Sequence, residues 1–225
     1  MGNNNFHSLI TQYRRKNLRK RLVWVFVAVA IISLRLVSCD KNGSVKSLPL
    51  SDYERYNERV FTCIKVVDGD TIDIDVPDLK SKRGHRFTRI RMWGIDTPEI
   101  AHHGRKAMYF GYEAAEFARR LLAGKKVRLK LIKGKTRGYY GRLLAYVFLP
   151  DGSMYNRLAI EKGYAYADYR FKHPYMKEFL KLEAEARKSC LGLWKKVTPN
   201  DLPHWYRKSK LKSFWKHRCN NAQNP

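Results

Sequence analysis

The ten residues VDGDTIDIDV, at Val67–Val76, decide the fold of this chain. Their Asp-Gly pair is a turn signal, and it separates two runs that are rich in β-branched residues. After the turn, isoleucine and valine alternate with polar residues, which is the period of a strand with one buried face. The stretch therefore predicts two strands, at 59–67 and 71–76, that are joined by a tight turn.

The spacing of apolar residues predicts the remaining strands and helices. Alternating apolar residues predict strands, whereas apolar residues spaced by three and four positions and followed by glycine predict helices. The additional strands are predicted at 86–95, 127–131 and 143–148, and the helices at 111–122, 156–162 and 175–189. The pattern indicates an α+β domain with five strands and three helices.

The composition favours a partner with many negative charges. The chain has 225 residues and a formal net charge of +26, and 44% of its residues are hydrophobic. This length fits one folded domain with flanking segments. The charge favours nucleic acid or an anionic membrane surface, although a basic soluble protein without a specific partner would share it. Aromatic residues interleaved with lysine and arginine suit stacking on nucleic-acid bases.

The N-terminus has the organisation of a targeting segment. A basic region at 1–21, which we expect to stay in the cytoplasm, precedes an apolar signal or membrane-anchor segment at 22–38. A polar linker at 39–57 leads to the folded domain at 58–195, and a basic aromatic tail occupies 196–225. This order predicts an exported or membrane-anchored protein whose folded domain lies outside the cytoplasm.

The four cysteines have different predicted roles. The residues LVSC that end at Cys39 resemble a bacterial lipobox, so Cys39 is a candidate for lipidation, although Arg35 departs from that motif. A plain uncleaved anchor is the alternative. No C-x-x-C pair is present, which disfavours a structural zinc site. Cys63 is expected to be buried, and a Cys190–Cys219 disulfide is compatible with an oxidising compartment.

Three carboxylates and two arginines stand in short motifs that would meet if the chain folds back on itself. The carboxylates are Asp70, Asp96 and Glu99, and the arginines are Arg91 and Arg142. Carboxylate oxygens bind hard divalent cations, and a guanidinium can clamp a phosphate that the cation also contacts. These are the groups that metal-assisted cleavage of a phosphodiester requires.

Four motifs in one order resemble the staphylococcal nuclease, or thermonuclease, family. They are VDGDT at Val67–Thr71, R-x-x-x-x-DTPE at Arg91–Glu99, YGR at Tyr140–Arg142 and GLW at Gly192–Trp194. The resemblance implies a five-stranded OB-fold barrel with three helices. It also implies an endonuclease of DNA or RNA with little sequence specificity, and Ca²⁺ as its cofactor, with Mg²⁺ or Mn²⁺ as alternatives. The AHHGR segment is similar to the membrane-anchored branch of the family.

The resemblance assigns a metal site and a base. Asp70 and Asp96 match the direct metal ligands, and the backbone carbonyl of Thr97 matches a third ligand. Glu99 matches the residue proposed as general base or as organiser of the attacking water. A helix-capping or supporting role is the alternative for Glu99.

The resemblance also assigns the substrate contacts. Arg91 and Arg142 match the two arginines that grip the scissile phosphate. Tyr140 matches a contact to the terminal phosphate of a bound nucleotide, although a tyrosine precedes it where the best-known member has lysine. Tyr169 and Phe171 match the aromatic pair that lines the nucleotide pocket, and Phe171 lacks the hydroxyl of its counterpart.

We expect the other polar residues near these motifs to have structural roles and not catalytic ones. Asp68 is expected to hydrogen-bond the local backbone of its turn. Arg89 shares the strand face of Arg91, yet a solvated surface arginine is the favoured interpretation. His102 and His103 are poor candidates as ligands, because imidazole prefers softer metals than an oxygen site does.

Two other functions remain alternatives at this stage. One is a non-catalytic nucleic-acid-binding OB-fold module tethered to a membrane. The presence of all five residues that match the family's active site argues against this alternative. The other is a basic membrane-surface protein, which would leave the carboxylates unexplained. We predict nucleic acid and the membrane as partners, with no specific protein partner and a monomeric state.

Overall fold

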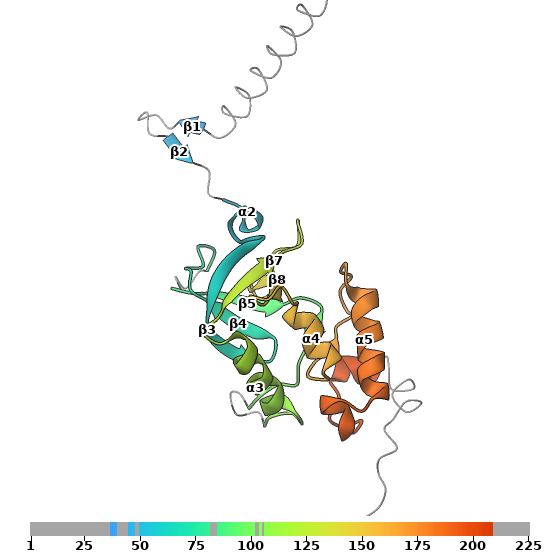
Figure 1. Cartoon of the computed structure of the whole chain (residues 1–225). Helices are drawn as coiled ribbons and strands as arrows, with labels where there is room; N and C mark the ends of the chain where they lie inside the picture. Colours follow the sequence, from blue (N-terminus) through green and yellow to red (C-terminus); the bar gives the residue numbers. More distant parts are fainter. Residues whose placement is uncertain are drawn as a thin grey trace, which may run out of the picture. The chain divides into compact units, whose positions relative to one another are not determined.

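The computed structural model describes residues 50–81, 85–101, 104 and 106–208, and the backbone of 37–39 and 45–47. The two short segments are β1 (Val37–Cys39) and β2 (Val45–Ser47), which pair with each other in antiparallel fashion. A separate compact unit begins at Asp52 (Figure 1). Most of the predicted anchor and the side chain of Cys39 lie outside the described residues. No helix in the described part of the chain has the length and apolar character needed to cross a membrane.

Five strands of the compact unit close into a barrel (Figure 1). They are β3 (Arg59–Asp68), β4 (Thr71–Ile74), β5 (Thr88–Met92), β7 (Lys126–Lys130) and β8 (Leu143–Phe148). Around the barrel their order is β3-β4-β5-β8-β7, and each neighbouring pair is antiparallel except β5 and β8. The closed barrel with its helices confirms the predicted fold class.

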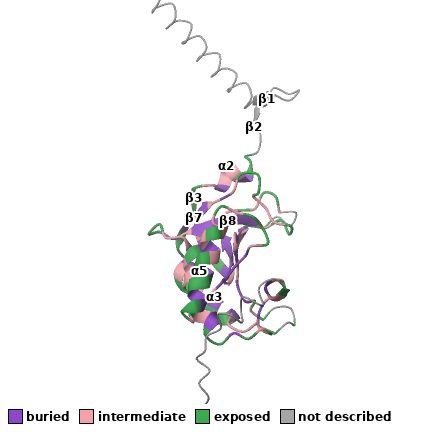
Figure 2. Ribbon diagram, turned by 90° about the vertical axis from the view of Figure 1, so that its right-hand side faces the viewer, coloured by how far each residue is buried: buried purple, intermediate pink, exposed green. Residues whose placement is uncertain are grey.

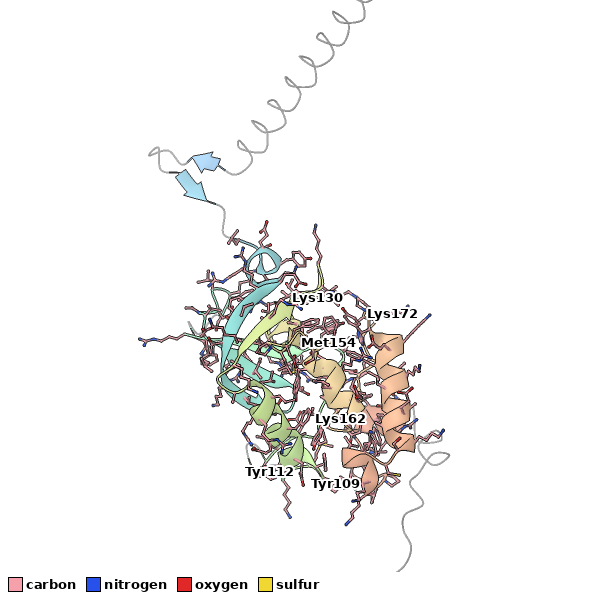
Figure 3. All side chains as sticks on the ribbon, in the orientation of Figure 1. Tyr109, Tyr112, Lys130, Met154, Lys162 and Lys172 are labelled. Carbon is pink, nitrogen blue, oxygen red and sulfur yellow. The ribbon has the colours of Figure 1, made fainter. Side chains whose placement is uncertain are left out.

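The three predicted helices are present with small shifts at their ends. They are α3 (Gly111–Leu122), α4 (Tyr155–Glu161) and α5 (Met176–Lys188). Each buries one face, and in α5 that face carries Phe179 and Leu182. Met154, directly before α4, packs against the barrel core (Figure 3). The apolar residues that recur every 3.6 positions therefore predict which face of each helix is buried.

The barrel interior is apolar, and purple buried segments run through it in Figure 2. Its fully buried residues include Ile72, Ile74, Ile90, Val127, Leu129 and Val147. Strand β4 differs from its prediction, because all four of its residues are buried instead of every second one. The reason is a partner on the outer face: Arg89 Nε contacts Asp73 Oδ1 at 2.7 Å and covers that carboxylate.

A short helix, α2 (Asp52–Tyr56), begins the compact unit within the stretch predicted as the end of the linker. Its Tyr56 is buried, and the tyrosine hydroxyl forms a hydrogen bond with the Thr88 hydroxyl at 3.1 Å. Asp52 accepts hydrogen bonds from Arg137 Nε and Nη2 at 3.0 and 2.9 Å. A single helical turn is too short to show a period, so only its tertiary contacts reveal it.

The residues after α5 form a second apolar cluster. The 3₁₀ helix η1 (Gly192–Lys195) leads into the C-terminal segment, by which we mean residues 197–208. In this segment Val197, Leu202 and Tyr206 are buried in a cluster that also contains residues of α5 and η1. The sequence shows no period here because the buried residues come from turns and from one short helical stretch at 204–208.

Gly163 positions η1 and has no room for a side chain. Its φ is +73°, and a Cβ at this position would lie 2.2 Å from the carbonyl oxygen of Leu191. The close approach lets the Leu193 N–H donate to the Gly163 carbonyl at 2.8 Å. We expect Gly163→Ala to lower the free energy of unfolding by more than about 1 kcal/mol in urea denaturation.

Gly124→Ala is the matched control for this prediction. Gly124 has a similar φ of +71°, but nothing lies within 4 Å of a Cβ added there. The control therefore isolates the cost of the backbone conformation from the cost of the steric clash. Equal losses of stability in the two variants would contradict the role given to the contact between Gly163 and Leu191.

Candidate active site

The turn between β3 and β4 fixes the first carboxylate of the site. The backbone N–H of Asp70 donates to Asp68 Oδ1 at 2.9 Å, which confirms the turn role predicted for Asp68. Burial and the charge of Asp70 raise the pKa of Asp68 to about 8. A Cβ on Gly69 would lie 2.8 Å from the Thr97 side chain, so the turn packs closely against the DTPE segment. The buried Tyr155 hydroxyl donates to the Gly69 carbonyl at 2.8 Å.

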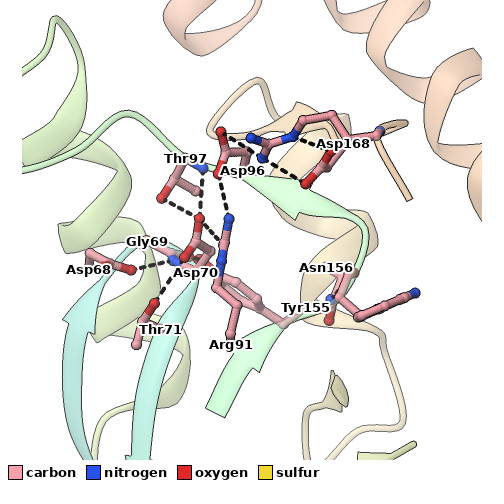
Figure 4. Close-up of polar contacts among 12 residues, drawn as sticks. Asp68, Gly69, Asp70, Thr71, Arg91, Asp96, Thr97, Tyr155, Asn156 and Asp168 are labelled. Atoms are coloured by element: carbon pink, nitrogen blue, oxygen red, sulfur yellow. Dashed lines mark hydrogen bonds and ion pairs between the residues drawn. The ribbon is translucent and has the colours of Figure 1, made fainter. Parts of the chain in front are cut away.

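The Asp70 carboxylate is buried and accepts hydrogen bonds on both oxygens (Figure 4). Oδ1 accepts from the Thr71 hydroxyl at 3.0 Å. Oδ2 accepts from the Thr97 backbone N–H at 2.8 Å and from its hydroxyl at 3.2 Å. These donors come from two separate motifs and hold the carboxylate in one orientation.

Arg91 lies between two carboxylates from different motifs. Strand β5 pairs with β4 so that Arg91 stands opposite Thr71, which brings its guanidinium to Asp70. The same guanidinium forms an ion pair with Asp96 (Figure 4). Burial alone would lower the pKa of Arg91, but Asp70 and Asp96 outweigh that cost and raise the pKa. Arg91 therefore stays charged and draws the two carboxylates together.

Asp96 is held from two further directions. It belongs to β6 (Ile95–Asp96), which pairs with β9 (Tyr166–Ala167). Its Oδ2 accepts a hydrogen bond from Trp205 Nε1 at 2.8 Å and lies 3.5 Å from Arg170 Nη2. Trp205 and Asp96 are 109 positions apart, and the sequence placed Trp205 only in a basic aromatic tail. The sequence therefore does not predict the contact between Trp205 and Asp96.

Glu99 and Arg142 lie close enough to this cluster to share its electrostatics. Burial, Asp70 and Asp96 raise the pKa of Glu99, and the charges of Arg91 and Arg142 oppose that rise. Within the residues that the structure describes, the Arg142 guanidinium has no ion pair and no hydrogen bond. Its donors are therefore available to an anionic ligand, in contrast to those of Arg91.

The predicted substrate-binding aromatics contact other rings. Tyr140 is 81% exposed, on the loop that carries Arg142. Tyr169 contacts Trp205 edge to face, with ring centroids 5.2 Å apart. Phe171 is 59% exposed, and its ring centroid lies 6.4 Å from that of Trp93. The exposed faces of Tyr140 and Phe171 are available for stacking.

The remaining polar residues singled out in the sequence divide into two groups. Arg89 binds Asp73 through two hydrogen bonds, at 2.7 and 2.9 Å, so it supports β4 instead of being simply solvated. His102 and His103 lie outside the described residues. The prediction that these histidines are not ligands stays a prediction.

Two cysteines of the compact unit have distinct states. Cys63 is a free thiol that is fully buried, as predicted, and burial raises its pKa to about 11. Cys190 is disulfide-bonded. Its predicted pairing with Cys219 involves a residue outside the described part of the chain and stays a prediction.

The donor set of the site suits a hard divalent cation. Asp70 and Asp96 converge on one guanidinium, and Thr97 adjoins both. No group of three or more His, Cys, Asp or Glu side chains among the described residues is placed to hold a metal ion. That finding is compatible with the predicted ligands, which are two carboxylates and one backbone carbonyl. Oxygen donors of this kind fit Ca²⁺ or Mg²⁺ in preference to softer metals.

The chain is similar in sequence to several known proteins. Residues 89–196 match the family model described as staphylococcal nuclease homologue. The chain is 33% identical over 180 residues to a thermonuclease of Staphylococcus hyicus, covering 80% of this chain and 98% of the relative. It is also 33% identical over 135 residues to a thermonuclease of Staphylococcus intermedius, covering 59% of this chain and 74% of the relative. An SPbeta prophage-derived endonuclease of Bacillus subtilis is 33% identical over 137 residues, which are 60% of this chain and 44% of the relative.

Proposed function

The chain belongs to the staphylococcal nuclease family, and from that premise we propose that it is a Ca²⁺-dependent endonuclease of DNA or RNA. The observation that carries the proposal is the meeting of Asp70, Arg91 and Asp96 at one point, although they come from the β3–β4 turn, β5 and β6. The charges of this cluster and of Arg142 reach Glu99 and shift its pKa. The cluster brings carboxylates that can bind a cation close to arginines, of which Arg142 has donors for a phosphate, and phosphodiester hydrolysis requires this combination.

Each side chain has a role that its surroundings support. Asp70 and Asp96, with the Thr97 carbonyl, would hold the cation, which when bound polarises the phosphate and neutralises its charge. Arg142 has donors that no described residue occupies, and they can form two parallel hydrogen bonds to phosphoryl oxygens. Arg91 supplies a second positive charge next to the carboxylates.

Glu99 is the residue that we assign to the attacking water. Its carboxylate is distinct from the two that contact Arg91, and its pKa is raised by burial and by the negative charges of Asp70 and Asp96. A carboxylate of raised basicity is suited to accept a proton from water beside the phosphorus. In this role Glu99 takes the proton while Arg142 stabilises the charge that builds on the phosphate.

Substrate binding would be mainly electrostatic. The net charge of +26 favours attraction to a polyanion, and the exposed rings of Tyr140 and Phe171 offer stacking surfaces. Both kinds of contact are shared by all nucleotides, because every unit has a phosphate and every base has a π-face. We therefore propose cleavage with little sequence specificity.

A digestion assay tests this function. The purified full-length chain, kept in mild detergent, is incubated with plasmid DNA and with RNA in the presence of Ca²⁺, Mg²⁺ or EDTA. We expect internal cleavage with a divalent cation and none with EDTA. Salt-dependent binding of an oligonucleotide without cleavage under every condition would contradict the proposal and favour the non-catalytic binding module.

A further inference from the structure

The C-terminal segment reaches the candidate metal site through one side chain. Trp205 Nε1 donates a hydrogen bond to Asp96 Oδ2 at 2.8 Å. The other carboxylate oxygen, Oδ1, contacts Arg91. Both oxygens of Asp96 are therefore held, one by a strand of the barrel and the other by a residue that follows the matched family region, which ends at 196.

Neighbouring side chains hold the Trp205 indole in place. The Arg170 guanidinium lies over its ring, 4.4 Å from the centroid, and the Tyr169 ring contacts it edge to face. Arg170 is itself fixed by two hydrogen bonds to Asp168, each at 2.8 Å. Cation–π and edge-to-face contacts of this kind fix both the orientation and the position of an indole ring.

The backbone on either side of Trp205 is anchored by buried residues. Leu202 is 1% exposed and Tyr206 is fully buried in the second apolar cluster. The Tyr206 hydroxyl accepts a hydrogen bond from Arg187 Nη1 of α5 at 3.3 Å. Because Tyr206 directly follows Trp205, this anchor fixes the position from which the indole reaches Asp96.

We propose that Trp205 is a positioning residue that holds the Asp96 carboxylate in the orientation that binds a divalent cation. The inference rests on the proposed function, since it assigns a cation to Asp96. An ionised carboxylate has about four lone-pair sites, so the indole N–H occupies one and leaves others for a cation. Groups that hydrogen-bond a metal ligand orient it, and their loss typically weakens metal affinity by about 10- to 100-fold.

Trp205→Phe is the variant that tests the proposal. Phenylalanine keeps a ring against Arg170 and Tyr169 but removes the N–H donor. We expect the Kd for Ca²⁺, measured by calorimetry on the full-length chain, to rise by about 10- to 100-fold. His204→Ala, at the exposed neighbouring position, is the matched control and should leave that Kd unchanged.

A second variant separates the hydrogen bond from general packing. Trp205→His keeps an aromatic ring with an N–H donor, so it should retain more Ca²⁺ affinity than Trp205→Phe. The unfolding midpoint of each variant shows whether the chain is folded. Unchanged Ca²⁺ affinity in Trp205→Phe, or equal losses in both variants, would overturn the positioning role.

The same measurements separate this inference from the proposed nuclease function. If the wild-type chain binds Ca²⁺ but cleaves neither DNA nor RNA, the nuclease proposal fails, while the effect of Trp205→Phe on Ca²⁺ affinity still supports the positioning role. If the wild-type chain cleaves and Trp205→Phe binds Ca²⁺ equally well, only the positioning role fails.

Discussion

Asp70→Asn will reduce metal-dependent cleavage to the level measured in EDTA. The amide keeps the shape of the side chain but removes the negative charge and one of the two acceptor oxygens. Its NH₂ group would also face the donors of Thr71 or Thr97, which now bind the carboxylate. A site that has lost one of its two carboxylate ligands should hold a divalent cation far more weakly.

The fold should survive this substitution. Arg91 keeps its ion pair with Asp96, so the loss of stability should stay below the about 3–5 kcal/mol that follows when a buried pair is broken completely. Single-turnover cleavage of a short oligonucleotide at saturating substrate measures the activity, and urea denaturation measures the stability. Cleavage that persists at the wild-type rate would remove Asp70 from the metal site.

Asp73→Asn is the matched control for Asp70→Asn. Asp73 lies on β4, three positions after Asp70, is also buried and also pairs with an arginine, Arg89. The side-chain contacts of Asp73 with described residues are with Arg89, which is not a residue of the candidate site. Its variant should lose stability and keep its cleavage rate, so a similar loss of activity in both variants would indicate a general effect on folding.

Arg142→Lys will lower kcat by about 100- to 1,000-fold, the effect typical of losing one preorganised donor to a transition state. Lysine keeps the positive charge but cannot form two parallel hydrogen bonds to the phosphoryl oxygens. Because attraction to the substrate depends mainly on total charge, KM should change far less than kcat. Steady-state cleavage of a labelled oligonucleotide at fixed salt separates the two quantities.

Arg89→Lys provides the comparison for Arg142→Lys. Arg89 is also an arginine near the barrel surface, but its guanidinium binds Asp73. The two variants change the net charge by the same amount, which is zero, so a general electrostatic effect is excluded. A near wild-type kcat for Arg142→Lys would contradict the phosphate-binding role and support a module that binds nucleic acid without cutting it.

Local patterns of residues predict the five strands, the three helices and the turn at Asp68. Apolar residues with a period of two predict a strand, and apolar residues with a period of 3.6 predict a helix, because each element buries one face. The spacing of apolar residues therefore predicts β8 and α3. An aspartate and glycine pair between two strands likewise determines a turn locally, because the hydrogen bond from Asp70 to Asp68 spans only two positions.

The enclosure of the site depends on contacts that form only when distant segments fold together. Arg91 bridges Asp70 and Asp96, and Trp205 reaches Asp96 across 109 positions of sequence. The C-terminal segment has no periodic signal, because its burial depends on turns that pack against α5. Contacts between distant segments depend on the closed barrel and on the packing of its helices, so no local pattern of residues can encode which indole meets which carboxylate.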